Sequence, residues 1–84
     1  MYRIVPDPVT YDQVAALPQE ALRSYAEVLA TLVLTPWNGR PQHRDNPDAA
    51  VRRWSFGPGA AGQVIYLILE DQREVHLLLV QWLS

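Results

Sequence analysis

The sequence predicts an α+β fold in which a helical hairpin is followed by an antiparallel sheet. Apolar residues recur at intervals of three and four between residues 18 and 35, which is the period of an amphipathic helix. Two runs rich in aliphatic and aromatic residues, 63–70 and 74–82, are typical of strands. Helices followed by a run of strands indicate segregated α and β layers. We expect one domain over residues 1–84, with a four-stranded, mainly antiparallel sheet and the hairpin on one face.

The first two elements are a short strand and a helix. The strand is Tyr2–Val5, and Pro6 closes it. The stretch "DPVTYDQVAAL" then begins a helix, because Asp7 can cap its N-terminus. Pro8 occupies the first helical position, where its missing N–H is not needed.

The second helix begins near Pro18 and ends at Thr35, because the residue before Pro36 is pushed out of the α region. Its apolar stripe predicts the residues that face the core. These are Leu22, Tyr25, Leu29 and Leu32.

Residues 36–50, "PWNGRPQHRDNPDAA", are predicted to form a loop. They contain three prolines and one Asn-Gly pair, and they offer little apolar surface that could pack. Loops of this length in a small domain are often functional. We expect Arg40, His43 and Arg44 in this segment to be exposed and mobile.

Three strands complete the chain: Val51–Phe56, Gln63–Glu70 and Glu74–Trp82. If the turn between the last two holds two or four residues, directly opposed residues share a face. One face then carries Gln63, Ile65, Leu67, Leu69, His76, Leu78, Val80 and Trp82. The other face carries Val64, Tyr66, Ile68, Glu70, Val75, Leu77, Leu79 and Gln81.

Both of these faces are mostly apolar. Strands that are apolar on both faces are normally buried on both, so each face should pack against another layer. Two helices can cover one face of a four-stranded sheet, about 15–20 Å wide at roughly 4.8 Å per strand. Either the 36–50 loop or a partner must cover the other. We expect a partner protein or a second copy of the chain, which would form a homodimer.

The composition excludes several classes of protein. The absence of cysteine excludes disulfides and thiolate chemistry. A net charge of −2 argues against a uniformly basic nucleic-acid binder, although residues 36–56 hold four arginines against two aspartates. No apolar run could span a bilayer, and the start lacks a signal-peptide core. We expect a cytoplasmic protein that needs no cofactor and makes no contact with a membrane.

The stretch "NPDAAVRRWSF" and the following "GQVIYLILEDQREVHLLLVQWL" resemble the RelE/ParE superfamily, the small toxins of bacterial type II toxin–antitoxin pairs. The helical hairpin after a short first strand belongs to the same pattern, so the resemblance covers nearly the whole chain. It implies a RelE-like order of strand, helix, helix and three strands. It also implies a cognate antitoxin as partner.

Members of the RelE branch cleave mRNA in the ribosomal A site, so the resemblance implies contact with ribosome and mRNA. This chain departs from the catalytic pattern of that branch. Gln63 stands where the pattern has an arginine before "L-V-Y", and Leu83 stands where an arginine closes the last strand. The tyrosine of the family's C-terminal tail has no counterpart in the 84 residues. The basic positions of the second strand survive as Arg52 and Arg53.

RNA cleavage by 2′-hydroxyl attack needs a base, an acid and cationic donors around the transition state. His76 is the histidine in regular structure and the acid–base candidate, and a satisfied core histidine is the alternative. Tyr66 could donate a proton, or belong to the core. Arg52 and Arg53 point to opposite faces of one strand, so at most one can join a given site. The predicted catalytic set is His76, Arg52, Arg53 and Tyr66.

A second set of residues is predicted to bind RNA without reacting. Arg40, His43 and Arg44 are candidate phosphate contacts, and Trp54 is a candidate stacking platform or core residue. Two histidines without carboxylate neighbours at ligand spacing are a weak metal signal, so we predict no metal site. The "GPGAAG" turn joins two strands and precedes no helix that could hold a phosphate.

Two functional hypotheses follow from these residues. The first is a ribosome-dependent mRNA endoribonuclease that acts as the toxin of a type II pair. The alternative is a non-enzymatic ParE-like growth inhibitor, or a RelE-fold binding protein that has lost catalysis. The missing arginines and the acidic charge favour the alternative, whereas the arginine pair and His76 favour the enzyme.

Overall fold

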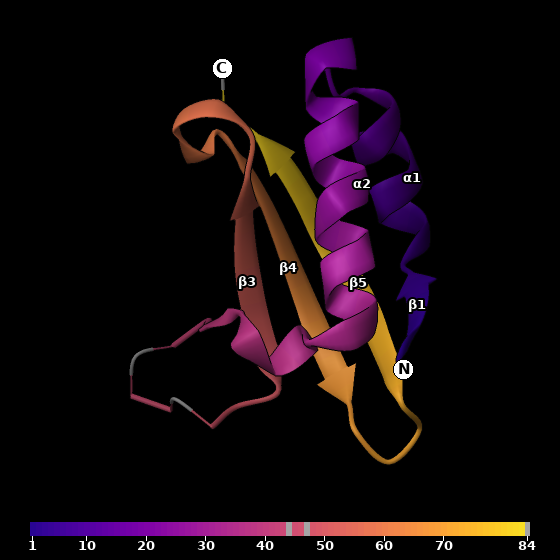
Figure 1. Ribbon diagram of the computed structural model, residues 1–84, viewed down its shortest axis with the longest axis vertical. Coiled ribbons are helices and arrows are strands. Elements are labelled where there is room, and N and C mark those ends of the chain that lie inside the picture. Colours follow the sequence, from indigo (N-terminus) through magenta and orange to yellow (C-terminus); the bar gives the residue numbers. More distant parts are fainter. Residues whose placement is uncertain (44, 47, 84) are drawn as a thin grey trace.

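The computed structural model describes residues 1–43, 45–46 and 48–83, and it confirms the predicted α+β class (Figure 1). Two helices lie over one face of a five-stranded sheet whose order is β1-β5-β4-β3-β2. Strand β1 runs parallel to β5, and the other neighbours are antiparallel. The elements are β1 (Arg3–Pro6), α1 (Pro8–Ala15), α2 (Gln19–Leu34), β2 (Arg40–Pro41), β3 (Val51–Phe56), β4 (Gly62–Leu69) and β5 (Glu74–Trp82), with short 3₁₀ turns at Pro36–Asn38 and Pro58–Ala60.

Helix α1 begins as the sequence predicts. The Asp7 carboxylate accepts a hydrogen bond from the Val9 N–H at 3.0 Å, and Pro8 is the first helical residue. Further along the helix, the Gln13 side-chain oxygen accepts from the Val80 N–H of β5 at 2.7 Å. This bond satisfies a backbone donor of β5 beyond the end of its pairing with β1, and it fixes α1 against the sheet.

The residues of α2 that face the core differ in part from the predicted apolar stripe. The residues buried on α2 are Ala21, Tyr25, Val28 and Leu32. Of the predicted stripe, Tyr25 and Leu32 are confirmed, whereas Leu22 is 43% exposed. Both stripes have helical spacing, and the small Ala21 allows the closer approach of the helix to the sheet.

The sheet has one strand more than predicted, because the 36–50 segment contains β2. This strand is two residues long and pairs antiparallel with Arg52 and Arg53 of β3. Pro41 cannot donate a backbone hydrogen bond, which is tolerated at the outer edge of a sheet. A two-residue strand containing proline leaves no periodic pattern in the sequence.

The predicted register of the last two strands is wrong beyond a β-bulge in β5. Ile65 lies opposite Leu79 and Tyr66 lies opposite Leu77, so Leu78 is an extra residue in β5. The register is as predicted from Glu74 to Leu77. Beyond the bulge the faces are exchanged. Val80 and Trp82 lie on the helix side, and Leu79 and Gln81 lie on the opposite side.

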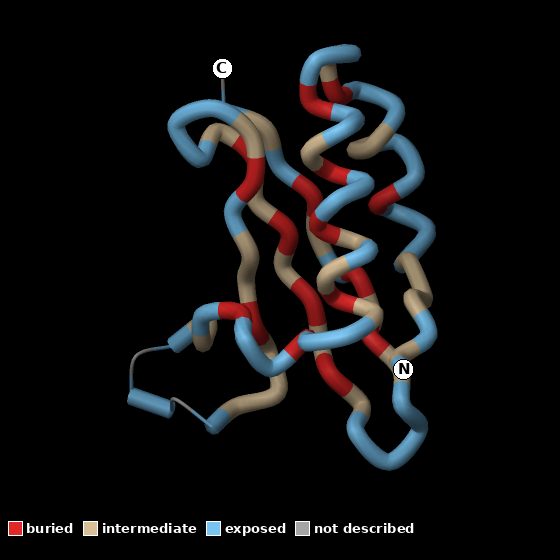
Figure 2. The backbone as a smooth tube through the Cα atoms, in the orientation of Figure 1, coloured by how far each residue is buried: buried red, intermediate tan, exposed pale blue. Residues whose placement is uncertain are grey.

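The hydrophobic core lies between the helices and one face of the sheet (Figure 2). In β4 the side chains of Val64, Tyr66 and Ile68 are buried, and the residues between them are only half-buried. The same alternation continues across β3 and β5. Every buried residue of these three strands is therefore on the helix side.

The buried guanidinium of Arg52 holds the two ends of the 36–50 segment together. Its Nε donates to the Ala49 carbonyl at 3.0 Å, and its Nη1 donates to the carbonyls of Trp37 and Gly39 at 3.3 and 3.1 Å. The guanidinium carbon also lies 5.1 Å from the centre of the Trp37 ring. Arg52 is 8% exposed, so these contacts are made inside the protein.

Tyr66 adds a second attachment for the same segment. Its hydroxyl donates to the Pro36 carbonyl at 2.7 Å, and a Cβ placed on Gly39 would lie 1.8 Å from the Tyr66 oxygen. Residue 39 must therefore be glycine. Because Tyr66 and Arg52 both point to the helix side, the start of the segment packs there and does not cover the opposite face.

Glu70 joins three parts of the chain at the end of β4. Its Oε1 accepts from the Tyr2 hydroxyl at 2.6 Å and from the Trp37 indole N–H at 2.7 Å. These two hydrogen bonds, with the positive charge of Arg73, hold the pKa of the Glu70 carboxyl below its usual value. The carboxylate thus links the N-terminal residues to the 36–38 turn.

Arg52 and Arg53 provide a matched test of this architecture. We expect Arg52→Met to lower the free energy of unfolding by about 3 kcal/mol, because buried carbonyls lose charged donors. For a domain of this size that corresponds to a decrease in Tm of more than about 10 °C. Arg53→Met should stay within about 0.5 kcal/mol, as for an ordinary surface site. Thermal and urea unfolding would measure both, and equal effects would contradict the assigned role of Arg52.

Candidate functional site

The face of the sheet opposite the helices, called the open face below, carries the polar side chains that could react. No other layer of described residues lies over it. Its centre is apolar, and charged residues stand at both sides. The residues of the open face are Arg3, Val5, Arg40, Val51, Arg53, Ser55, Gln63, Ile65, Leu67, Leu69, Glu74, His76, Leu79 and Gln81.

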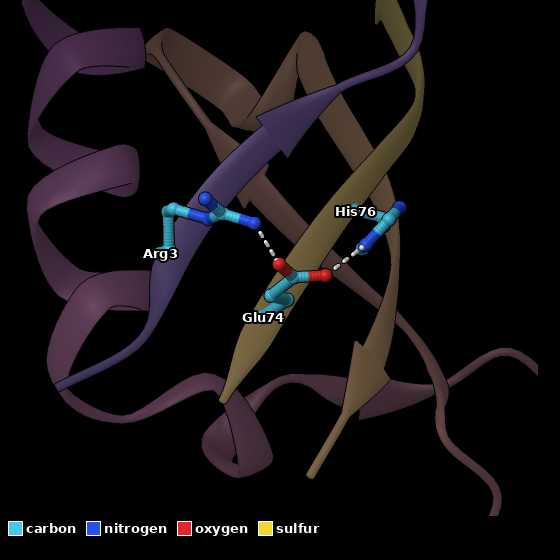
Figure 3. Close-up of polar contacts among 3 residues, drawn as sticks. All are labelled: Arg3, Glu74 and His76. Carbon is cyan, nitrogen blue, oxygen red and sulfur yellow. Dashed lines mark hydrogen bonds and ion pairs between the residues drawn. The ribbon is translucent and has the colours of Figure 1, made fainter. Parts of the chain in front are cut away.

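A carboxylate at one side of the open face bridges a histidine and an arginine (Figure 3). Glu74 Oε1 lies 2.9 Å from His76 Nε2, and Glu74 Oε2 accepts from Arg3 Nη2. Glu74 and His76 are two residues apart in β5 and so share a face. Arg3 stands directly opposite Glu74 in the parallel strand β1.

The bridge sets the proton arrangement of the cluster. The hydrogen bond to His76, and then the one to Arg3, hold the pKa of the Glu74 carboxyl below its usual value, so it is a carboxylate at neutral pH. A carboxylate that accepts at Nε2 requires the proton there, which leaves the Nδ1 lone pair as the basic position of a neutral imidazole. The His76 side chain is 32% exposed, so a ligand on the open face can reach it.

The structure separates the four residues predicted to be catalytic. His76 and Arg53 share the open face, but β4 lies between their strands and they are two residues out of line, which puts their backbones roughly 12 Å apart at the usual strand spacings. Arg52 and Tyr66 are buried on the helix side. Burial raises the pKa of Tyr66 to about 12, with the charge of Arg52 and the backbone of Gly39 acting in the opposite direction. These four side chains therefore do not meet at one place.

The residues predicted to bind RNA also differ in their positions. Arg40 is exposed on the open face, opposite Arg53. His43 is exposed in the segment that follows β2. Trp54 is half-buried at the edge of β3 and packs against the core. Arg44 lies outside the described residues.

Sequence reasoning missed two members of the cluster, Glu74 and Arg3. The spacing of Glu74 and His76 in "EVH" is a signal that could have been used, because strand residues two apart share a face. Arg3 carries no such signal, since its pairing with Glu74 depends on the parallel contact of the first and last strands.

The described residues were compared with the requirements of a metal site and of a membrane-spanning helix. No group of three histidine, aspartate or glutamate side chains there is placed to hold a metal ion. Neither described helix combines the length and apolar character needed to cross a bilayer.

The comparison with solved structures is decisive for the fold. The isolated E. coli RelE toxin superposes with a TM-score of 0.79 at 9% sequence identity, covering 100% of this chain and 86% of that one. This chain has the RelE fold. Two structures of one arginine-to-alanine double mutant of E. coli RelE also match. The one in complex with the antitoxin peptide RelBc has a TM-score of 0.78 at 9% identity and covers 99% of this chain and 84% of that one. The free one has a TM-score of 0.76 at 13% identity and covers 96% and 82%.

The two comparisons that use sequence alone do not detect the likeness to RelE. Comparison with family models finds no match, and comparison with curated proteins finds none either. The likeness therefore rests on the arrangement of the helices and strands. The predicted RelE-like order of elements is confirmed by that arrangement.

The carboxylates of Glu74 and Glu70 predict acid sensitivity. Both have a depressed pKa in the folded protein, so they stabilise it above the ordinary value of 4.5, and that stabilisation is lost as the pH falls below 4.5. Glu74→Gln and Glu70→Gln should flatten the dependence of Tm on pH between about pH 3 and 5. Glu27→Gln, at an exposed site without an ion pair to a described residue, is the control. Three parallel pH profiles would contradict the assignment.

Proposed function

We propose that the protein is the toxin of a type II toxin–antitoxin pair and acts as a ribosome-dependent mRNA endoribonuclease. The observation that carries the proposal is the Glu74 carboxylate bridging His76 and Arg3 on an uncovered sheet face. A carboxylate that orients a histidine is a recurrent arrangement for general base catalysis. The RelE fold supports the choice of RNA as the substrate class.

In the proposed reaction the RNA's own 2′-hydroxyl is the nucleophile. His76 Nδ1 takes the hydroxyl proton as the oxygen attacks the adjacent phosphorus. The bond from phosphorus to the 5′-oxygen breaks, a 2′,3′-cyclic phosphate forms, and the leaving oxygen takes a proton from solvent. Glu74 stabilises the imidazolium that results, and Arg3, which is 75% exposed, lies beside it to stabilise charge on the phosphate.

Arg53 has a different role in this proposal. It lies across the open face from His76, so it positions the RNA strand and does not touch the reacting atoms. Arg52 and Tyr66 act through the fold alone, because both are buried on the other side of the sheet.

We further propose that an antitoxin covers the open face. Ile65, Leu67 and Leu79 form its apolar centre, and no described layer of the chain lies over them. A solved RelE structure is a complex with an antitoxin peptide, which supports this class of partner. Apolar surface of this kind on one side of a sheet normally marks an interaction site.

The same apolar centre supports the second candidate function, a non-enzymatic growth inhibitor that binds its target through this face. Gln63 and Leu83, where the RelE pattern has arginines, favour it. In that case the His76 cluster would stabilise the fold or contact the target without reacting.

Loss of the imidazole distinguishes the two functions. We expect His76→Ala to lower ribosome-dependent mRNA cleavage by about 10²-fold, as for removal of a general base. Glu74→Gln should lower it as well, since the imidazolium loses its counter-charge. Primer extension on a reporter mRNA after induced expression measures both, with Gln81→Ala on the same strand face as the matched control. Growth arrest with intact transcripts would overturn the enzyme and favour the inhibitor.

The apolar centre of the open face can be tested on the purified protein. At micromolar concentration the chain alone should self-associate and bind a hydrophobic dye, and Leu67→Gln with Leu79→Gln should reduce both effects. Leu22→Gln with Leu34→Gln, at exposed positions on α2, is the control. Sedimentation velocity gives the association state. A monomeric wild-type protein that binds no dye would contradict the need for a partner on this face.

A further inference from the structure

A hollow of about 240 Å³ lies between α2 and the outer edge of β3 (Figure 1). Strand β2 pairs only with Arg52 and Arg53, so no described strand lies beside β3 from Trp54 onward. The hollow opens on the helix side of the sheet, away from the His76 cluster. Its polar and aromatic lining residues are Ser24, Glu27 and Thr31 of α2 and Trp54, Ser55 and Phe56 of β3.

The hollow carries one negative charge and no positive one. Glu27 is exposed, and its carboxylate forms no ion pair with a described residue. No arginine or histidine is among the lining residues. A cationic ligand would therefore supply the charge that the protein leaves out of this hollow.

The backbone of Ser55 adds a carbonyl at the free edge of β3. Ile68 N–H donates to the Ala50 carbonyl and Gln42 N–H donates to the Val51 carbonyl, so odd-numbered residues of β3 turn their backbone groups away from β4. Strand β2 ends before it could meet Ser55. The Ser55 side chain leaves the sheet on the open face, so this residue meets the hollow with its backbone.

The hydroxyl groups of α2 add further acceptors. Ser24, Glu27 and Thr31 recur at intervals of three and four and so share one side of the helix. Thr31 Oγ1 donates its proton to the Glu27 carbonyl at 2.9 Å, which leaves the oxygen as an acceptor for a ligand. The hollow therefore offers a carboxylate, a carbonyl and hydroxyl oxygens. An alkylammonium group has three donors and no acceptor, which matches this set.

The two aromatic residues supply an apolar wall. Trp54 and Phe56 lie opposite Val64 and Gly62, so both side chains are on the helix side. Phe56 is buried, whereas Trp54 is half-buried and can still meet a ligand. Indole rings attract cations, and the methylenes of a long amine can pack along the same ring.

We propose that this hollow binds a primary alkylammonium group, with the ammonium between Glu27 and the Ser55 carbonyl and its methylenes along Trp54. The small volume suits an unbranched chain better than a drug-sized ligand. The group can belong to a free aliphatic diamine or to a lysine side chain of another protein. The inference goes beyond the proposed function and does not depend on it, because the hollow and the His76 cluster lie on opposite faces of the sheet.

The test is an NMR titration of the full chain, followed by the backbone amides of residues 24–31 and 54–57. The probes are Nα-acetyl-lysine methylamide and 1,4-diaminobutane, and the matched control is Nα-acetyl-norleucine methylamide, which keeps the side-chain methylenes without the ammonium. We expect saturable shifts in the millimolar range with both amines and none with the control. Tighter binding of the diamine assigns the hollow to free amines, and tighter binding of the lysine derivative assigns it to a lysine of a partner.

Two glutamates of α2 separate the site from general charge attraction. Glu27→Gln should weaken binding of the amines by about 3- to 5-fold, the size of an exposed ion pair. Glu20→Gln makes the same change in net charge at an exposed position of the same helix. It lies roughly 10 Å along the helix axis from Glu27, about one Debye length at 0.1 M salt, so affinity should be nearly unchanged.

Substitutions of Trp54 test the aromatic contact. Trp54→Phe should bind the amines nearly as well as the wild type, whereas Trp54→Leu should weaken binding by about 2- to 5-fold. Circular dichroism and thermal unfolding control for the packing of residue 54 against the core. Because Glu27 is exposed, its comparison with Glu20 remains valid even where a Trp54 variant fails to fold.

Two results would overturn the proposal. Equal losses for Glu27→Gln and Glu20→Gln would show attraction to the net charge of the protein alone. Shifts with the norleucine control as large as those with the lysine derivative would show an apolar groove that does not recognise the ammonium. Loss of mRNA cleavage in the His76 variant, or its absence in the wild type, would leave this site unaffected.

Discussion

One layer of helices over a sheet that is apolar on both faces is the constraint on which the rest of this structure depends. Side chains alternate along a strand, so α1 and α2 can bury only every second residue of β3, β4 and β5. In β4, Val64, Tyr66 and Ile68 belong to the core, and the residues between them are only half-buried. The candidate His76 cluster, the apolar centre, Arg40 and Arg53 all belong to the accessible half. The core and the candidate site thus lie on two faces of the same strands.

Much of the fold could be predicted from the sequence, because its long elements carry strong local signals. The Asp7–Pro8 start of α1, the proline that ends α2 and the two long C-terminal strands depend on residues close together in the chain. Strand β2 could not be predicted, since two residues show no period. The bulge at Leu78 could not be predicted either. The residues that follow it make long-range contacts that no local pattern encodes: Trp82 packs against Phe56, with ring centres 6.0 Å apart, and the Val80 N–H donates to Gln13.

The candidate site was harder to predict than the fold. The sequence identified His76 by its residue type and Arg53 by its charge, and the structure places both on the open face. It could not show that Arg52 is held by three carbonyls of its own chain, because those bonds depend on the path of the 36–50 segment. Tyr66 and His76 fall on opposite faces through the alternation of two neighbouring strands. Chemistry inferred from residue types alone therefore included two residues whose role is to hold the fold.

The parallel pairing of β1 with β5 has a consequence for the order in which parts of the structure form. Arg3 and Glu74, which meet in the His76 cluster, are 71 residues apart, and among the described strands β1 pairs with β5 alone. During synthesis the growing chain can form its helices early, since their contacts are local. The cluster cannot assemble until the last strand has left the ribosomal tunnel and closed against the first. Assembly of the His76 cluster is therefore a late event in folding, which follows the closure of β5 against β1.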